Sequence, residues 1–176
     1  MTFKKLQALL EKDGETLSEE VWNVIRLSMG GNPRKTKRFA NSFYLSGCFL
    51  NHPNQDLQEK VQNGSLSRIS QERQSFYLAK ILAFQMSFPD FYQHLRHHPG
   101  DWRYLEEEVI LQKDATKREQ TLKGTVKLSE FWADASFRDF MSKTSKSTSQ
   151  NNPPAPSYDI VEALLDATSL VTETPS

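Results

Sequence analysis

The stretch QERQSFYLAKILAFQMSF, residues 71–88, is the most apolar part of the chain and decides the fold class. From Phe76 to Phe88, ten of the thirteen residues are apolar, and Lys80 is one of three polar residues that interrupt them. The stretch is too short and too polar to span a bilayer. We therefore expect a buried helix at the centre of the fold, closed by Pro89 because the residue before proline avoids the α conformation.

The composition around this stretch favours helices throughout. Only seven of the 176 residues are glycine, and long stretches are rich in Leu, Glu, Lys, Gln and Ala. The length suits one domain with a tail. We expect an all-α fold, an irregular bundle of about six to eight helices with a disordered C-terminal linker and a terminal amphipathic helix.

The overall charge points away from whole-protein attraction to nucleic acid or to an anionic membrane. Lysines plus arginines and acidic residues both total 22, so the net charge is zero and any electrostatic function has to be local. The single cysteine, Cys48, excludes an intramolecular disulfide, fits a reducing compartment and is expected to be buried. The first residues lack the apolar region of a signal peptide, so we expect a cytoplasmic protein that does not insert into membranes.

Towards the N-terminus the sequence predicts two short helices. Residues 3–11 have an apolar side and a lysine side. Ser18 is a good N-cap for the second helix, because two glutamates follow it in the first turn, where they meet the positive end of the helix dipole. Gly30 and Gly31 should end that helix, since glycine accepts the left-handed conformation that closes helices.

The next helix is expected to start at a fixed point and to run from Arg34 to about Leu50. Asn32 can cap it, and Pro33 fits its first position, where the missing N–H removes no hydrogen bond. Because Gly30 and Gly31 stand directly before this cap, the change from one helix to the next is abrupt. The chain therefore fixes the direction in which the first arginine points.

Four cations gather at this helix start, with no acidic residue between Gly30 and Asn51. They are Arg34, Lys35, Lys37 and Arg38. Free backbone N–H groups and the dipole at a helix start already favour anions. A solvated basic face is the simpler explanation of the charge, but such a face needs no Gly-Asn-Pro break. The segment predicts that these four side chains contact phosphate.

The rest of the chain divides into a connection, further helices and a tail. Residues 51–70 should be a connection with at most one short helix, followed after the central helix by helices over 90–98 and 101–112. An aromatic cluster between Leu128 and Met141 should dock on the core. The expected domains are a bundle over 1–141, a flexible linker over 142–157, an amphipathic helix over 158–170 and a disordered tail over 171–176.

Two further groups of polar residues were weighed as sites. His94 and His98 lie one turn apart, a spacing that zinc sites use, but their place before Pro99 favours interaction with the negative end of a helix. The acidic residues at 106–108 are adjacent in sequence and are expected to be solvated. No nucleophile motif is present, so we expect no enzyme activity from this chain on its own and no metal site.

Two segments resemble a known family. Asn32-Pro33-Arg34, followed by Lys37-Arg38-Phe39 and Asn41, is similar to the G-N-P-R-x-x-K-R-F-x-N segment in the C-terminal helical region of KAP-type P-loop NTPases. Residues 80–92 resemble the long apolar helix of that region, which runs into Phe-Pro-Asp/Glu-Leu-Tyr. Together the two segments cover roughly residues 18–112.

The resemblance implies a lid-like helical module that packs on a nucleotide-binding core. Arg34 would take a sensor-like position facing the nucleotide phosphates, supported by Lys37 and Arg38. The implied partner is a P-loop NTPase core domain or chain that binds ATP with magnesium. This chain has no Gly-x-x-x-x-Gly-Lys-Ser/Thr motif, so no cofactor is expected for it alone.

Two alternatives remain open at this point. The helix that contains Trp22, the Gly30–Gly31 turn and the basic helix could form a nucleic-acid-binding unit like a helix-turn-helix. The helix expected at 158–170 could instead serve as a docking peptide of a protein–protein adaptor.

Overall fold

The computed structural model describes residues 16–52, 61, 64–146 and 151–172, and the helix expected at 3–11 lies outside them. In this described part the fold is all-α, as predicted, with nine α-helices and no strand. The α-helices are α2 (Glu19–Met29), α3 (Pro33–Asn51), α5 (Gln71–Ser87), α6 (Pro89–His97), α7 (Asp101–Tyr104), α8 (Ala115–Lys123), α9 (Val126–Ala133), α10 (Ala135–Lys143) and α11 (Tyr158–Thr172). A 3₁₀ turn, η1 (Ser65–Arg68), and a π-helical segment, η2 (Leu105–Ile110), complete them.

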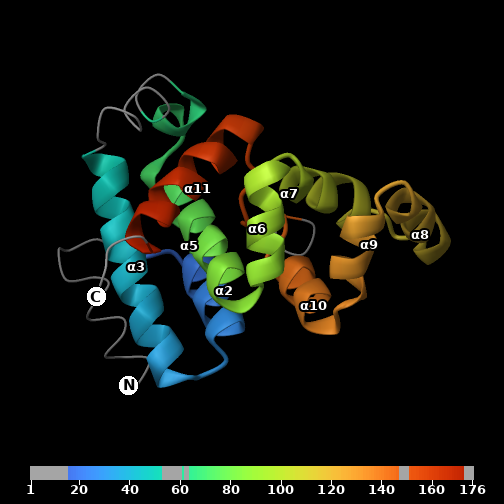
Figure 1. Ribbon diagram of the computed structural model, residues 1–176, viewed down its shortest axis with the longest axis horizontal. Coiled ribbons are helices and arrows are strands. Elements are labelled where there is room, and N and C mark those ends of the chain that lie inside the picture. Colours follow the sequence, from blue (N-terminus) through green and yellow to red (C-terminus); the bar gives the residue numbers. More distant parts are fainter. Residues whose placement is uncertain (1–15, 53–60, 62–63, 147–150, 173–176) are drawn as a thin grey trace.

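Helix α5 is the centre of the bundle, as its apolar sequence predicts. Every residue from Phe76 to Phe84 is buried, so this part of the helix has no solvent-facing side. Helices α2, α3, α6 and α11 all contact α5 (Figure 1). Ser70 caps α5, the helix ends at Ser87, and one residue, Phe88, separates it from α6, which begins with Pro89.

The aromatic cluster of α9 and α10 packs on this central helix, as expected. The ring centroids of Phe137 and Phe91 lie 4.7 Å apart, and those of Phe140 and Phe84 lie 5.9 Å apart. Most of these pairs are tilted or edge-to-face, the arrangements that aromatic rings prefer. The cluster joins the C-terminal helices of the bundle to α5 and α6.

The segment expected as one helix over 101–112 is helical but changes type. α7 continues directly into η2, and the pair turns Trp102, Leu105 and Val109 into the core. Glu106 is also buried, with 6% of its surface exposed, which corrects the expectation that the acidic residues at 106–108 are all solvated. Its place four residues after Trp102 puts both side chains on the same buried side.

The terminal helix α11 packs on the bundle. Its apolar side is buried and contacts α3, α5 and η1. The buried residues are Ile160, Val161, Ala163, Leu164, Leu165 and Ala167. The docking-peptide hypothesis needs this apolar side for a partner, and in the structure it is part of the core.

Of the expected flexible linker over 142–157, the structure describes residues 142–146 and 151–157, some of which are buried against the bundle. α10 continues to Lys143, and Thr144 and Asn152 are buried. The Tyr77 hydroxyl donates a 2.7 Å hydrogen bond to the Pro154 carbonyl, and Asn152 Nδ2 donates to the Ser145 carbonyl. The composition offers little apolar surface, and the contacts that these residues make with the bundle are polar.

Cys48 is exposed, which corrects the expectation that it is buried. The buried side of α3 carries Phe39, Ala40, Ser46 and Leu50, and the helical spacing puts Cys48 on the opposite side. In the described part of the chain, no helix is long and apolar enough to cross a membrane.

Candidate functional site

The start of α3 is fixed by a turn of three residues after α2. Gly30 and Gly31 have φ values of 55° and 73°, in the left-handed region that non-glycine residues rarely adopt. Asn32 follows as the N-cap, its N–H donates to the Met29 carbonyl at 3.0 Å, and Pro33 takes the first helical position. The turn and cap have the form that the sequence predicts. The Arg34 side chain therefore projects from a defined position in the first turn of α3.

The backbone N–H groups at this start are not free for an anion, contrary to the expectation from sequence. Asn32 Oδ1 accepts hydrogen bonds from the Arg34 and Lys35 amides at 3.0 and 3.2 Å. The Thr36 amide donates to the Asn32 carbonyl at 2.9 Å, and Pro33 has no N–H. An anion at this site would therefore be bound by side chains, with help from the helix dipole.

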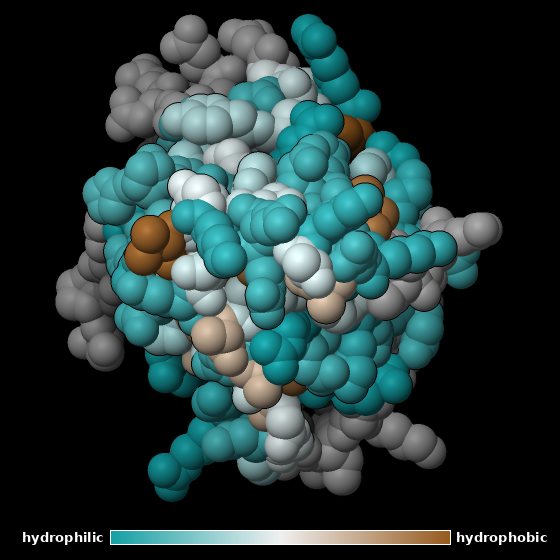
Figure 2. All heavy atoms as spheres, turned by 90° about the vertical axis from the view of Figure 1, so that its right-hand side faces the viewer, coloured by the Kyte–Doolittle hydropathy of each residue, from teal (hydrophilic) through white to brown (hydrophobic). Residues whose placement is uncertain are grey.

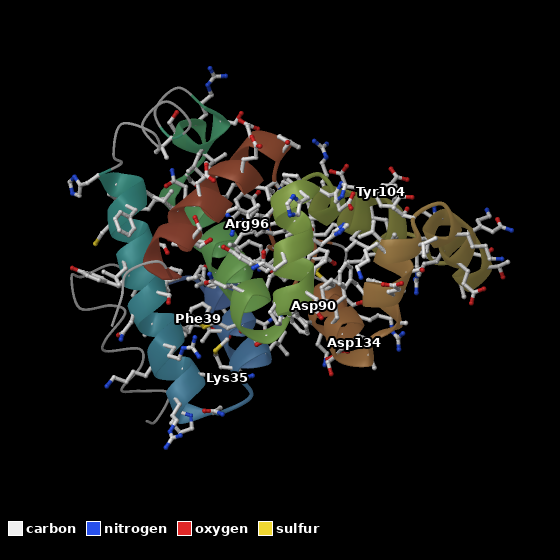
Figure 3. All side chains as sticks on the ribbon, viewed as in Figure 1. Lys35, Phe39, Asp90, Arg96, Tyr104 and Asp134 are labelled. Atoms are coloured by element: carbon white, nitrogen blue, oxygen red, sulfur yellow. The ribbon has the colours of Figure 1, made fainter. Side chains whose placement is uncertain are left out.

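Three of the four cations form one stripe on the solvent side of α3. Arg34, Lys37 and Arg38 stand at positions i, i+3 and i+4, which are neighbours on a helix surface, and all three are exposed. Lys35 is exposed too, but it lies one turn before Phe39 and so on the side that faces the bundle (Figure 3). We call Arg34, Lys37 and Arg38 the α3 basic stripe.

The core holds the helix behind this stripe. Phe39 and Ala40 directly follow the stripe and are fully buried, with exposed fractions of 0% and 1%. The Phe39 ring stacks on Phe43 at 6.0 Å between centroids. The cap and these anchors thus tie the backbone of the stripe to the bundle, and its long side chains extend into solvent.

Two of the acidic residues at 106–108 pair with cations other than those of the stripe. Glu106 pairs with Lys80, and Glu107 Oε2 accepts from Arg103 Nε at 2.8 Å. Among the described residues, no ion pair involves Arg34, Lys35, Lys37 or Arg38. The positive charge of α3 thus faces solvent.

A second polar cluster lies inside the core and was missed by the sequence analysis. Lys80 Nζ donates to Glu106 Oε1, and the same oxygen accepts from Trp102 Nε1 at 2.7 Å. Lys80 also donates to the Thr144 carbonyl at 3.2 Å, and its ammonium lies 5.4 Å from the Trp102 ring centroid. The available signal was a lysine inside a uniformly apolar helix, which needs a partner in the core.

Burial determines how these groups titrate. It lowers the pKa of Lys80, while the Glu106 carboxylate acts in the opposite direction. Burial also raises the pKa of Tyr77 to about 12, against the effect of the nearby Arg73 guanidinium. Lys80 has an exposed fraction of 0%, so no substrate can reach its amine in this conformation. The cluster stabilises the fold by tying α5 to η2 and to the residue after α10.

The histidines pair with neighbours at the end of α6. His94 Nε2 lies 2.6 Å from Asp101 Oδ2, and the His94 and His98 rings stack at 4.7 Å. No group of three or more metal-ligating side chains comes together among the residues that the structure describes. The α3 basic stripe therefore remains the candidate site.

No protein-family model, curated protein or solved structure matches this chain. The likeness to KAP-type NTPases is thus carried by the two quoted segments alone, and the function has to be argued from the residues described above.

Proposed function

We propose that this protein is a non-catalytic helical module that presents the α3 basic stripe to a phosphate-bearing partner. The observation that carries the proposal is the exposed stripe of Arg34, Lys37 and Arg38 on a helix start held by the Asn32 cap and the buried Phe39. Arginine can bind phosphate oxygens with two hydrogen bonds, which makes it suited to this contact.

The preferred form of the proposal is a lid-like module for a nucleotide held by a P-loop domain or chain. Arg34 then contacts a phosphate of ATP with magnesium bound mainly by that partner, and Lys35, Lys37 and Arg38 add positive charge. Two features support this form: the helix start uses its own N–H groups for the Asn32 cap, and the side chains of Arg34, Lys37 and Arg38 are exposed on the solvent side. A phosphate held by another domain would approach α3 from the solvent side and contact these side chains.

The core cluster of Lys80 and Glu106 is separate from the α3 basic stripe and is closed to solvent. Both side chains, which pair with each other, are enclosed by the bundle. The exposed thiol of Cys48 agrees with a reducing compartment, and we keep the cytoplasm as the proposed location.

One observation favours nucleic acid as a second candidate partner. The turn from Gly30 to Asn32 has three residues and joins two helices, and the cations lie in the first turns of the second helix. Helix-turn-helix proteins use a turn of this length and contact DNA with the start of the second helix. Here the phosphates would be those of a nucleic-acid backbone.

Two titrations separate these candidates. Fluorescence anisotropy with a labelled DNA duplex should show only weak binding by the isolated chain if the lid form is right, and ATP with magnesium should bind weakly as well. Micromolar duplex binding with a steep salt dependence would instead support the nucleic-acid form, because phosphate contacts release counterions. If neither titration shows binding that depends on the α3 basic stripe, the result contradicts both candidate functions.

A further inference from the structure

A cavity of about 320 Å³ lies where α6, α9 and α10 meet, far along the chain from the α3 basic stripe. Phenylalanines form its walls: Phe91 and Phe137 are buried behind it, and Phe88 and Phe131 are half-buried. The ring centroids of Phe88 and Phe137 lie 5.3 Å apart, as do those of Phe91 and Phe131. The size is at the small end of the range of about 300–1,000 Å³ for ligand pockets.

The rim of this cavity is acidic. Asp90 from the first turn of α6, Glu130 from α9 and Asp134 before α10 all line it and are exposed. Figure 3 shows Asp90 and Asp134 at neighbouring helix starts. Against these three carboxylates stands one ammonium, that of Lys127, so the lining carries a net charge of −2 (3 negative, 1 positive). The face made by the C-terminal helices is otherwise mostly hydrophilic, with small separate hydrophobic patches (Figure 2).

One cation of the protein, the Lys127 ammonium, already contacts both an aromatic ring and a carboxylate of this lining. Lys127 Nζ lies 5.3 Å from the centroid of the Phe131 ring and 2.9 Å from Glu130 Oε2. This is the geometry of a cation–π contact assisted by an ion pair. The Phe131 ring and the Glu130 carboxylate thus already hold one ammonium group.

We propose that this cavity binds an alkylated ammonium group, either a free quaternary ammonium compound or a trimethylated lysine side chain. Aromatic faces attract such cations through their quadrupole, and methyl groups reduce the cost of removing the charge from water. The carboxylates of Asp90 and Glu130 lie at the rim, where they attract the charge without entering the aromatic part. Lys127 carries the same charge as the ligand and competes with it for Phe131 and Glu130.

The first test compares probes on the full chain by ¹H–¹⁵N NMR titration. Choline should bind saturably and shift amides of α6, α9 and α10, while its neutral isostere 3,3-dimethyl-1-butanol should bind about tenfold more weakly. A short peptide with trimethyl-lysine, set against its unmethylated form, distinguishes a side-chain ligand from a small molecule. Tighter binding of the methylated peptide than of choline indicates a protein partner, and the reverse order indicates a free metabolite.

Variants then test the named groups. Phe131→Leu keeps an apolar wall but removes the ring face, and should weaken choline binding by about tenfold. Lys127→Gln removes the competing ammonium from an exposed position and should tighten binding by a few-fold, about the effect of one nearby charge. Glu119→Gln on α8 is the matched control and should leave the affinity unchanged. The proposal is overturned if neither choline nor the methylated peptide binds at about 20 mM, if the neutral isostere binds equally well, or if Lys127→Gln weakens binding.

Discussion

Lys80 Nζ donates a hydrogen bond to Glu106 Oε1 in the centre of the bundle, where the two side chains have exposed fractions of only 0% and 6%. The two residues are 26 positions apart and join α5 to the π-helical segment η2. The same carboxylate oxygen also accepts from Trp102, and Lys80 also donates to the Thr144 carbonyl. The pair thus connects α5, the α7–η2 segment and the residue that follows α10.

Removing one member of this pair should cost far more than removing both. Lys80→Met leaves the Glu106 carboxylate in the core without its cation, and we expect the free energy of unfolding to fall by about 3–5 kcal/mol. Lys80→Met combined with Glu106→Gln keeps an acceptor for Trp102 and should recover most of that loss. Urea denaturation measures both. The exposed pair of Lys143 and Asp139 is the control, since Lys143→Ala should cost at most about 1 kcal/mol. Additive losses in the double variant would contradict this coupling.

The start of α11 should make stability depend on pH in the acid range. Hydrogen bonds from Ser157 and Ser65 lower the pKa of Asp159 from 3.8 to about 2. The folded state thus favours the carboxylate, so its stabilising contribution is present above about pH 4 and is lost as the pH falls towards 2. Asp159→Asn should lower the free energy of unfolding at pH 6 by at most about 1 kcal/mol, since the group is exposed.

The difference between wild type and Asp159→Asn should then shrink on acidification. Urea denaturation at pH 6, 4 and 2.5 follows it directly. A difference that stays constant over this range would show that the hydrogen bonds to Asp159 do not depend on its charge.

The contact between Tyr77 and Pro154 should hold the segment before α11 in place. Tyr77→Phe removes the hydroxyl that donates to the Pro154 carbonyl, and we expect a loss of about 1–2 kcal/mol and faster proteolysis near residues 151–157. Tyr104→Phe is the matched control, because its hydroxyl donates to the Thr121 carbonyl at 3.0 Å in another part of the bundle. Equal cleavage near 151–157 in both variants would count against a specific anchor.

The Asn32 cap should matter for the helix start but not for phosphate binding. Asn32→Gly removes the acceptor of the Arg34 and Lys35 amides at a cost of a few tenths of a kcal/mol. If side chains bind the phosphate, the affinity for inorganic tripolyphosphate should change less than about twofold, whereas Arg34→Ala should weaken it clearly. Isothermal titration calorimetry gives both values. Much tighter binding to Asn32→Gly would mean that backbone N–H groups are the better anion site.

Local signals explain why much of the fold could be predicted. The end of α2 and the start of α3 follow from the Gly30–Gly31 pair and the Asn32 cap, which act within one or two turns. Ser18 stands at the N-cap position of α2, although its side chain makes no capping hydrogen bond. The burial of α5 follows from its own apolar sequence. These features need no knowledge of distant contacts, and the all-α class follows from them.

Features that depend on distant partners could not be predicted in this way. Glu106 looked solvated because its neighbours in sequence are acidic, and only its approach to Lys80 explains its burial. The residues around Asn152 have the composition of a linker, and the sequence does not reveal their hydrogen bonds with Tyr77 and Ser145. The four cations of α3 are exposed at a helix start, and their contact with phosphate stays a prediction. The use of the N–H groups of this helix start by Asn32 is visible only in three dimensions.

The most direct test of the proposed function is a ¹H–¹⁵N NMR titration of the chain with inorganic tripolyphosphate at about 20 mM salt, where phosphate contacts are least screened. It compares wild type with two triple variants of equal charge change: Arg34→Ala/Lys37→Ala/Arg38→Ala in the stripe and Lys113→Ala/Lys117→Ala/Lys123→Ala around α8. We predict that amides of residues 33–38 shift in wild type and in the α8 variant, and that this response is lost in the stripe variant. An equal response of both triple variants, or shifts centred away from the start of α3, would contradict the account.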